Sequence, residues 1–311
     1  MNAKSGLMVL GDWGTSVSRF YLCRFYQQHL TVLARSQGRG IKHISDPEAC
    51  FFELCQDWFN QYGPLPVFLI GTVGADIGWK KAPYVACPTD KHQLLENAIT
   101  FQAKGIDITI LPGVTCTNHY DLPDIMRGEE TQLFGFLSQY PQQKEQLVCL
   151  PGTHTKWALL ANNQIQSFVT SPVGELYEVL NQHSVLLNPA INQKACSVTF
   201  TQGLQVGMSE NSNVLHTLFA TRSLQVINNM DNSQAAGYLS GLLIGADVKA
   251  AMKDFHLFSD VSVIGSDYIC SLYVQALNHI GITNKLFSSE DATILGMQAL
   301  AATNWESYIN E

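Results

Sequence analysis

Leu7-Met8-Val9-Leu10-Gly11-Asp12-Trp13-Gly14-Thr15-Ser16 is an apolar run that ends in a Gly-Thr turn, and the β-prone run Arg19-Phe20-Tyr21-Leu22-Cys23 follows it. The same pattern returns as Leu147-Val148-Cys149-Leu150-Pro151-Gly152-Thr153-His154-Thr155, followed by Trp157-Ala158-Leu159-Leu160. Each segment continues through a polar turn into a third β-prone run, at 30–34 and at 164–170. The repetition predicts two related half-molecules, each opening with a three-stranded meander.

The two Gly-Thr turns are candidates for binding phosphate. A tight glycine turn exposes backbone N–H groups, and its hydroxyls add further donors for phosphate oxygens. Two such turns facing each other across a cleft would hold a nucleotide triphosphate between two domains. Asp12 lies in the first turn, where an acid would hold Mg²⁺ through water. The alternative is that both segments are ordinary β-hairpins and that Asp12 only favours a turn.

Composition excludes several classes of protein. The chain has 311 residues, of which 46% are hydrophobic, so it is long enough for two globular domains. A net charge of −8 without a basic run disfavours nucleic acid and anionic membranes as partners. The longest apolar region, 235–251, is interrupted by Asp247 and Lys249 and is not a membrane span. Eight scattered cysteines without a C-x-x-C pair favour reduced thiols in the cytoplasm.

Hydrophobic periodicity predicts an α/β fold for both halves. In the first half we expect a helix over 47–62, a buried strand over 67–70, a glycine-rich loop over 71–80, a helix over 90–103 and a strand over 108–111. In the second half we expect helices over 174–184, 206–222 and 234–253, a strand over 261–266 and a helix to about 280. The predicted domains are 1–137 and 138–290, and a final helix, 291–303, is expected to pack against the first.

The usual nucleotide motifs are absent, because the sequence has no G-x-x-x-x-G-K-[ST] and no G-x-G-x-x-G after a strand. Instead, the two turns and Val263-Ile264-Gly265-Ser266 resemble the phosphate-1, phosphate-2 and adenosine motifs of the actin/hexokinase/Hsp70 superfamily. Within it, the chain resembles the 2-dehydro-3-deoxygalactonokinase family. Segments spread over nearly the whole chain carry this resemblance: 12–14, 78–84, 126–133, 151–157, 174–176 and 239–246.

The resemblance implies a fold of two ribonuclease H-like (actin-like) domains with an inter-domain cleft that binds ATP and Mg²⁺. It implies that the ATP site is formed by the motif residues Gly14, Thr15, Ser16, Gly152, Thr153, His154, Gly265 and Ser266. Asp12 would serve in catalysis and hold the metal through water. A homo-oligomer is compatible with this assignment.

The substrate implied by the resemblance is a small sugar acid, 2-dehydro-3-deoxy-D-galactonate, phosphorylated on its 6-hydroxyl. Its carboxylate needs a cation or an N–H nest. The candidate substrate-binding residues in the motif segments are Lys80, Arg127, Lys156 and Glu175. Two departures limit the transfer: Val173 stands where the family has Thr, and Lys81 occupies a position that varies in the family and is given no role.

Phosphoryl transfer to a hydroxyl also needs a general base. Glu129 and Glu130 begin a predicted helix before the second hairpin, and the parallel with related sugar kinases favours Glu129. Both acids could instead simply favour the helix N-terminus. Two other functions remain open: an exopolyphosphatase-like or nucleotide-hydrolysing enzyme of the superfamily, and a non-catalytic ATP-binding actin-like protein.

Overall fold

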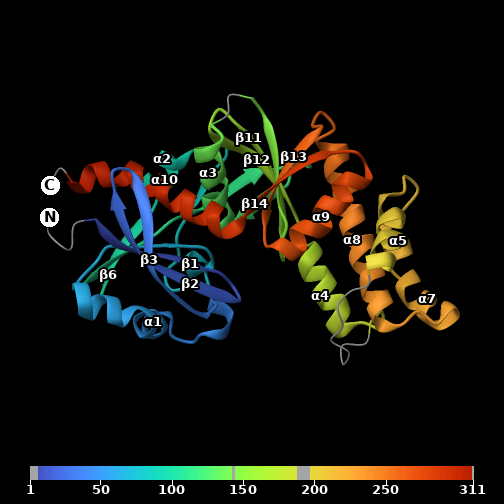
Figure 1. Ribbon diagram of the computed structural model, residues 1–311, viewed down its shortest axis with the longest axis horizontal. Helices are drawn as coiled ribbons and strands as arrows, with labels where there is room; N and C mark the ends of the chain where they lie inside the picture. Colours follow the sequence, from blue (N-terminus) through green and yellow to red (C-terminus); the bar gives the residue numbers. More distant parts are fainter. Residues whose placement is uncertain (1–5, 142–143, 188–196, 310–311) are drawn as a thin grey trace. The chain divides into compact units, whose positions relative to one another are not determined.

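The computed structural model describes residues 6–141, 144–187 and 197–309. Its internal contacts divide the chain into two units (Figure 1). The first unit comprises Met1–Glu145, Leu160–Phe168 and Ser289–Glu311, and the second unit comprises Gln146–Leu159 and Val169–Ser288. The domain boundaries predicted from the sequence, after residues 137 and 290, stay a prediction.

The first unit is built on a six-stranded sheet in the order β3-β2-β1-β4-β7-β6. The predicted meander is confirmed as β1 (Leu7–Trp13), β2 (Val17–Tyr26) and β3 (His29–Arg39). Strands β4 (Val67–Ile70) and β7 (Ile106–Ile110) run parallel to β1, whereas β6 (Ile99–Ala103) pairs antiparallel with β7. The parallel strands are buried on both faces and therefore read as continuous apolar runs.

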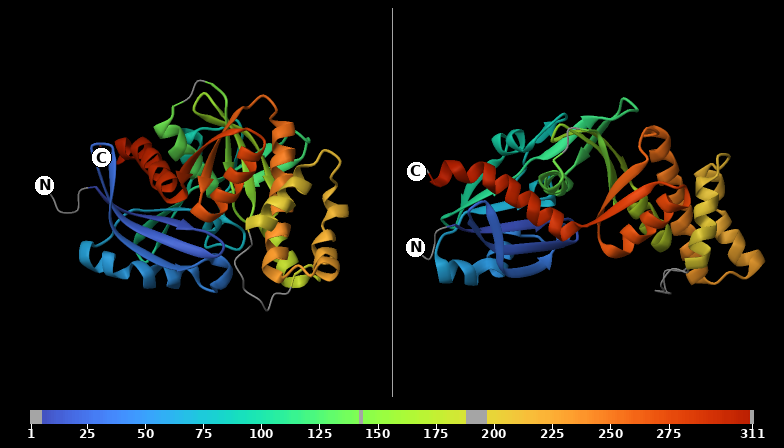
Figure 2. Two further views of the ribbon diagram at one scale, coloured as in Figure 1. Left: turned by 45° about the vertical axis from the view of Figure 1, so that its right-hand side comes forward. Right: turned by 45° about the horizontal axis from the view of Figure 1, so that its top comes forward.

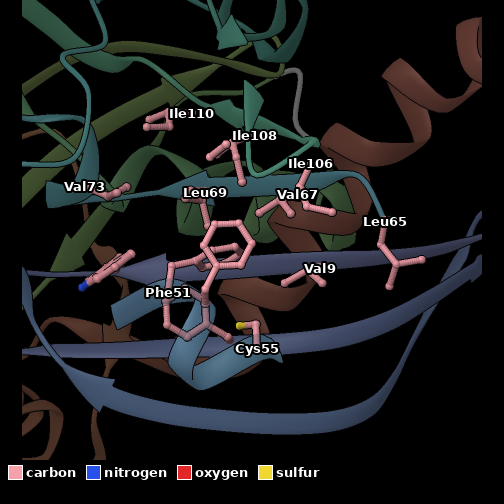
Figure 3. Packing of buried hydrophobic residues seen from close by; sticks show 14 of the residues in the cluster. Val9, Phe51, Cys55, Leu65, Val67, Leu69, Val73, Ile106, Ile108 and Ile110 are labelled. Carbon is pink, nitrogen blue, oxygen red and sulfur yellow. The ribbon is translucent and has the colours of Figure 1, made fainter. Parts of the chain in front are cut away.

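Alternate residues of these strands face different helices, because strand side chains point to opposite faces. Val9 and Leu69 pack with Phe51 and Cys55 of α1 (Pro47–Tyr62), as Figure 3 shows. On the opposite face, strand residues meet residues of α2 (Lys91–Glu96) and α10 (Ser289–Ile309): Leu10, Phe68 and Ile70 lie with Leu95, Met297 and Leu300. Figure 2 shows α1 (light blue) and α10 (red) on opposite sides of the blue strands.

A second, three-stranded sheet in the order β5-β8-β9 belongs to the first unit. Its strands are β5 (Tyr84–Ala86), β8 (Gly113–Thr117) and β9 (Pro123–Met126). Two 3-10 turns, η1 (Ile41–His43) and η2 (Thr72–Gly74), follow β3 and β4. Segment 160–168 joins this unit because Thr89 and Ile165 form a β-bridge and the Cys116 thiol donates to the Phe168 carbonyl at 3.2 Å.

The predicted helix over 90–103 is wrong in its second half. Helix α2 ends at Glu96, and residues 99–103 form β6, which turns back into β7. Lys104 and Gly105 adopt positive φ values of 48° and 76°, the backbone of a tight hairpin turn. Asn97 ends the helix, because its N–H bonds to the carbonyls of Leu94 and Leu95 rather than continuing the helical pattern.

Helix α3 (Glu129–Gln139) follows β9 and crosses α10 at very short range. A Cβ on Gly135 would lie 1.9 Å from the carbonyl oxygen of Ala292. On the other helix, a Cβ on Gly296 would lie 1.9 Å from the carbonyl oxygen of Thr131. The crossing therefore depends on glycine at both positions, and it fixes how α3 lies on the first unit.

The second unit contains a sheet in the order β12-β11-β10-β13-β14, to which Leu160–Phe168 contributes part of β11 and β12. The repeated meander is confirmed as β10 (Gln146–Leu150), β11 (Thr155–Ala161) and β12 (Gln164–Ser171). Strand β13 (Asp260–Gly265) runs parallel to both β10 and β14 (Thr283–Ser288). Helices α9 (Asp267–His279) and α8 (Asn232–Asp254) cover its core, with Tyr273 and Val248 fully buried.

Helix α8 packs closely on α5 (Ser197–Met208), where a Cβ on Gly241 would lie 2.0 Å from the carbonyl of Phe200. The predicted helix over 206–222 is instead divided among α5, α6 (Val214–Thr217) and α7 (Ala220–Asn228). Asn213 caps α6 by accepting from the Leu215 N–H at 3.0 Å. Helix α4 (Val173–His183) completes the unit. Among the described residues, the model has no helix of the length and hydrophobicity needed to span a membrane.

The α3–α10 crossing gives a direct test of the fold. Gly135→Ala should lower the free energy of unfolding by about 1–3 kcal/mol, because overpacking forces the helices apart. Alanine is otherwise the better helix former by about 1 kcal/mol, so propensity alone predicts the opposite sign. Urea denaturation measures the difference. Gln139→Ala, at an exposed position of the same helix, is the matched control and should change little. An unchanged or increased stability in Gly135→Ala would contradict the close crossing.

Candidate active site

The first part of the site forms where β1, β4 and α3 come together. Asp12 in β1 is the register partner of Ile70 in β4. Gly71 follows with φ +89°, and a Cβ there would lie 2.8 Å from the Trp13 carbonyl. Gly128 has φ +110°, and a Cβ there would lie 3.4 Å from the Gly71 Cα. Glycine at both positions lets the backbones approach, which brings the start of α3 to the end of β1.

Asp12 is a partly buried carboxylate in contact with a cation. Its Oδ2 lies 3.5 Å from Nη1 of Arg19, and its side chain is 22% exposed. Burial raises the pKa of Asp12 to about 6, the positive charge of Arg19 opposes this rise, and the negative charge of Glu129 adds to it. Asp12 and Glu129 are therefore close enough to repel each other electrostatically. Asp12, when ionised, suits a hard divalent cation.

The fit to Mg²⁺ follows from the chemistry of these donors. Within the described residues, no group of three or more His, Cys, Asp and Glu side chains could hold a metal by itself. Mg²⁺ in phosphoryl-transfer sites is commonly bound through one or two carboxylates together with waters and substrate phosphates. Asp12 alone, with bound phosphates, matches that pattern.

The first Gly-Thr turn is held through its carbonyl oxygens. Those of Gly14, Thr15 and Ser16 accept from the N–H groups of segment 40–42 at 3.0, 3.1 and 2.9 Å. The Thr15 hydroxyl also bonds to that of Thr72 at 3.1 Å. Thr15 and Ser16 are exposed. A turn anchored in this way keeps its shape, which is what a binding loop for phosphate needs.

Arg127 has a half-buried guanidinium with unused donors. Its Nη2 donates to the carbonyls of Ala82 and Pro83 at 2.9 and 3.3 Å. Its Cζ lies 4.3 Å from the centre of the Tyr84 ring. Its Nε and Nη1 are buried and have no hydrogen-bond partner in the part of the chain that the structure describes. Because buried donors are normally paired, these two nitrogens indicate a site for an anion.

Glu129 and Glu130 both bend back from the first turn of α3 onto the preceding backbone. Oε2 of Glu129 accepts from the Arg127 N–H at 3.1 Å, and Oε2 of Glu130 accepts from the Gly128 N–H at 2.7 Å. Glu129 is partly exposed, whereas Glu130 is fully buried. Burial raises the pKa of Glu130 to about 8, and the charge of Glu129 adds to the rise. Only Glu129 is therefore open to a substrate.

The two lysines after the glycine-rich loop have different surroundings. Lys80 places its Nζ 4.6 Å from the centre of the Phe101 ring. Lys81 pairs with the exposed Asp76 at 2.7 Å, which agrees with its being given no role. The predicted substrate contact of Lys80 stays a prediction, and its cation–π contact places it against β6.

The second Gly-Thr turn is hydrogen-bonded to the start of α4. The Glu175 N–H donates to the Thr153 carbonyl at 2.9 Å, and Nε2 of His154 lies 2.8 Å from Oε2 of Glu175. A Cβ on Gly174 would lie 2.4 Å from the Gly152 carbonyl, so glycine permits this contact. The structure thus pairs His154, predicted for phosphate, with Glu175, predicted for the substrate. Val173 packs against the core, and no hydroxyl stands there.

The remaining second-unit predictions differ in accessibility. Lys156 is only 3% exposed, and its Nζ donates to the His154 carbonyl at 3.2 Å, so it supports the turn from within. Gly265 lies against Pro151, whose carbonyl would be 3.3 Å from a Cβ at that position. Ser266 is exposed at the N-cap of α9, and its side chain makes no capping bond. Gly265 and Ser266 therefore border the second turn.

Sequence reasoning missed a buried carboxylate behind this turn. Oδ2 of Asp247 accepts from Tyr273 Oη at 2.7 Å and from Trp157 Nε1 at 3.2 Å. The Tyr273 hydroxyl also bonds to Thr155 at 2.9 Å, directly after the turn. Burial raises the pKa of Asp247, and these bonds oppose the rise. An acid inside the apolar run 235–251 was the available signal, because such a residue needs buried partners.

Comparison with known proteins identifies the family of the chain. A family model described as 2-keto-3-deoxy-galactonokinase matches residues 12–300. The 2-dehydro-3-deoxygalactonokinase of Escherichia coli (strain K12) is 32% identical, over 93% of this chain and 96% of its own.

Solved structures agree on the fold. A Sinorhizobium meliloti protein assigned provisionally to 2-dehydro-3-deoxygalactonokinase superimposes with a TM-score of 0.84 at 28% identity, covering 96% of this chain and 97% of its own. The activator of 2-hydroxyisocaproyl-CoA dehydratase from Clostridium difficile, with bound ADPNP, has a TM-score of 0.53 at 12% identity, covering 98% of each chain, and shows the fold alone.

The predicted α/β fold of ribonuclease H-like, actin-like halves is confirmed. The resemblance inferred from the motifs is confirmed as well, since the family match extends over nearly the whole sequence. The chain belongs to the 2-keto-3-deoxy-galactonokinase family.

Proposed function

We propose that the protein transfers the γ-phosphoryl group of ATP to the 6-hydroxyl of 2-dehydro-3-deoxy-D-galactonate, giving ADP and the 6-phosphate. One observation carries this proposal beyond the family relationship. Segment 127–129 presents a half-buried guanidinium, two of whose nitrogens have no hydrogen-bond partner among the described residues, and, two residues later, a partly exposed carboxylate. An anion site beside a candidate base suits a substrate that has a carboxylate at one end and a reacting hydroxyl at the other.

Glu129 is the proposed general base. Its Oε2 is oriented by the Arg127 N–H at 3.1 Å, and its charge acts on Asp12. In phosphoryl transfer, a carboxylate that accepts the hydroxyl proton as the oxygen attacks phosphorus contributes about 10²–10⁴ in rate. Glu130 is fully buried and cannot reach a substrate hydroxyl.

Asp12 is the proposed holder of Mg²⁺, through water, and Mg²⁺ would neutralise charge on the phosphates. Thr15 and Ser16 of the first unit and Gly152 and Thr153 of the second unit would donate to phosphate oxygens. Gly265 and Ser266 would border the adenosine. Arg19, 3.5 Å from Asp12, limits the rise in its pKa and so favours the ionised form that a metal requires.

Arg127 is the proposed partner of the substrate carboxylate. The carbonyls of Ala82 and Pro83 and the ring of Tyr84 hold the guanidinium in place. Its Nε and Nη1 would then donate to the carboxylate oxygens, in charge-assisted bonds that are stronger than neutral ones. We place the reaction in the cytoplasm, a proposal that rests on the seven described cysteines being free thiols.

An assay of ADP release tests the proposed function. We expect ATP turnover that depends on 2-dehydro-3-deoxy-D-galactonate and Mg²⁺, with the phosphate recovered on the sugar acid. The panel should include other 2-keto-3-deoxy sugar acids and the corresponding sugars without a carboxylate. Inorganic phosphate released without sugar acid would favour a hydrolase, and intact ATP with every sugar acid would favour a non-catalytic ATP-binding protein.

Glu129→Gln should lower kcat by about 10² or more, because the amide keeps size and hydrogen bonding but cannot accept the proton. The KM for ATP should change little, since the residue is not expected to bind the nucleotide. Steady-state kinetics with both substrates measure these effects. Glu53→Gln, which removes an exposed carboxylate of α1 to which no role is given, is the comparison and should retain far more turnover. Near-normal kcat in Glu129→Gln would assign the base elsewhere.

Arg127→Ala should raise the KM for the sugar acid about 10–150-fold, because a charge-assisted contact is worth about 1.5–3 kcal/mol. The KM for ATP should stay close to that of the wild type. Lys81→Ala removes a neighbouring cation that already pairs with Asp76, and it serves as the charge-matched control. A rise confined to the KM for ATP would place Arg127 on the nucleotide instead.

A further inference from the structure

Glu130 is a buried carboxyl group to which the proposed reaction gives no role. Its side chain has no exposed surface. Its Oε2 accepts from the Gly128 N–H at 2.7 Å, whereas Oε1 is buried and has no hydrogen-bond partner in residues 6–141, 144–187 and 197–309. An ionised carboxylate offers about four acceptor positions, so the backbone N–H groups of Gly128 and of Glu130 itself leave it poorly compensated in the protein interior. The geometry therefore disfavours a charge on Glu130.

The neighbours of Glu130 also disfavour a second negative charge. Glu129 is adjacent in the same helical turn and raises the pKa of Glu130, whereas Arg127 lowers it. At Thr131, the residue after Glu130, α10 contributes the uncharged backbone of Gly296, and Gly71 at the end of β4 lies beside Gly128. Glu129 and Arg127 are the charged groups that act on Glu130. Glu129, the adjacent residue, disfavours a negative charge on Glu130.

The hydrogen bond between Glu130 and Gly128 lies between the two residues to which the proposed reaction gives roles. Gly128 has φ +110° and joins Arg127, the proposed carboxylate site, to Glu129, the proposed base. The Gly128 N–H is directed at Oε2 of Glu130, so this bond sets the orientation of the peptide between the two functional residues. Loss of the bond would release a buried N–H and allow the turn to rotate.

We propose that Glu130 is a positioning residue held as the neutral carboxylic acid, which fixes the Gly128 turn and leaves Glu129 the one ionised carboxylate at the start of α3. A neutral Glu130 lets Glu129 keep its charge and accept the substrate proton. The inference rests on the proposed function for the role of Glu129, but not for the protonation state of Glu130.

Glu130→Gln tests the protonation state without any catalytic assay. The pKa of Glu130 is about 8 in the folded protein, against 4.5 for an ordinary Glu, so the folded state binds the proton more tightly between these values. Wild-type stability must then decline as pH rises through that interval. Glutamine does not titrate. The Tm of Glu130→Gln relative to the wild type should therefore increase steadily from about pH 5 to pH 8 and then level off.

Glu129→Gln is the matched control for the same melting experiment. This variant lacks the negative neighbour, so the pKa of Glu130 in it should be lower than in the wild type. The Tm difference between Glu129→Gln and the double variant Glu129→Gln plus Glu130→Gln should therefore change less with pH than the Tm difference between the wild type and Glu130→Gln. Infrared difference spectra of the wild type against Glu130→Gln should also show a protonated carboxyl band at pH 7. A Tm difference that does not change with pH, or the absence of this band, would overturn the neutral acid.

Kinetics test the positioning role. Above about pH 8 the wild type should lose kcat as Glu130 ionises beside Glu129, and Glu130→Gln should lack this loss while remaining active at pH 7. Glu130→Leu removes the acceptor for the Gly128 N–H and should lower kcat about 10-fold or more, as misplaced catalytic groups do.

A folded Glu130→Gln with kcat reduced as far as in Glu129→Gln would overturn the proposal and make Glu130 the base. If the melting and infrared results hold but no sugar acid is phosphorylated, the proposed function fails and the neutral acid stands.

Discussion

The approach of two glycine backbones, Gly71 after β4 and Gly128 before α3, determines where the charged groups of the first unit lie. Both residues have positive φ values, +89° and +110°, in a region that other residues rarely adopt. Gly71 also lies where a Cβ would meet the Trp13 carbonyl at 2.8 Å. A side chain at Gly71 would push against the end of β1, and at Gly128 it would be strained by the positive φ and would shift the start of α3. Asp12 would then lose its electrostatic relation to Glu129, and Arg127 would lose its place beside Tyr84.

That approach concentrates three carboxyl groups and two arginines in a small region, and burial separates their roles. Asp12 is partly exposed and has a cation 3.5 Å away, so it can stay ionised and meet a metal. Glu129 is partly exposed and has an N–H to orient it. Glu130 is fully buried, which raises its pKa to about 8, although the backbone N–H groups of Gly128 and of Glu130 itself oppose the rise. The differences among the three acids come from the number of donors and the water available to each rather than from their chemistry.

Sequence reasoning predicted the fold well, because strands buried on both faces and Gly-Thr turns leave clear patterns. Helix α1 was predicted with the bounds 47–62 that the structure shows, since Asp46 caps it and Gly63 ends it. The helix expected over 90–103 was wrong, because Ile99, Phe101 and Ala103 alternate as a strand and the turn at Lys104 and Gly105 was not recognised. Pairing with β7 decides that segment, and no short-range pattern reports a strand partner.

Sequence reasoning located the candidate site only in part. Motifs indicated Asp12, Arg127 and Glu129, but not the ring of Tyr84 under the guanidinium or the burial that separates Glu130 from Glu129. The pair His154–Glu175 could not be predicted either, since it depends on Gly174 letting α4 approach the turn. Contacts of this kind join residues far apart in sequence, and a residue's type does not reveal which neighbour the fold will bring to it.

The two Gly-Thr turns differ in the charged residues they carry, and the difference suits them to different ligands. The first turn carries Asp12, an acid suited to a metal, whereas Pro151, Gly152 and Thr153 occupy the second and carry no charge. The second unit does have an acid close behind its turn, but Asp247 is bonded to Trp157 and Tyr273 and is enclosed in the core. Its carboxyl group is therefore hydrogen-bonded inside the core and does not face the turn's exposed residues. A phosphate at the second turn would meet N–H groups and a hydroxyl, and the carboxylate beside that turn, Glu175, is paired with His154. The first turn keeps the acid that a cation needs.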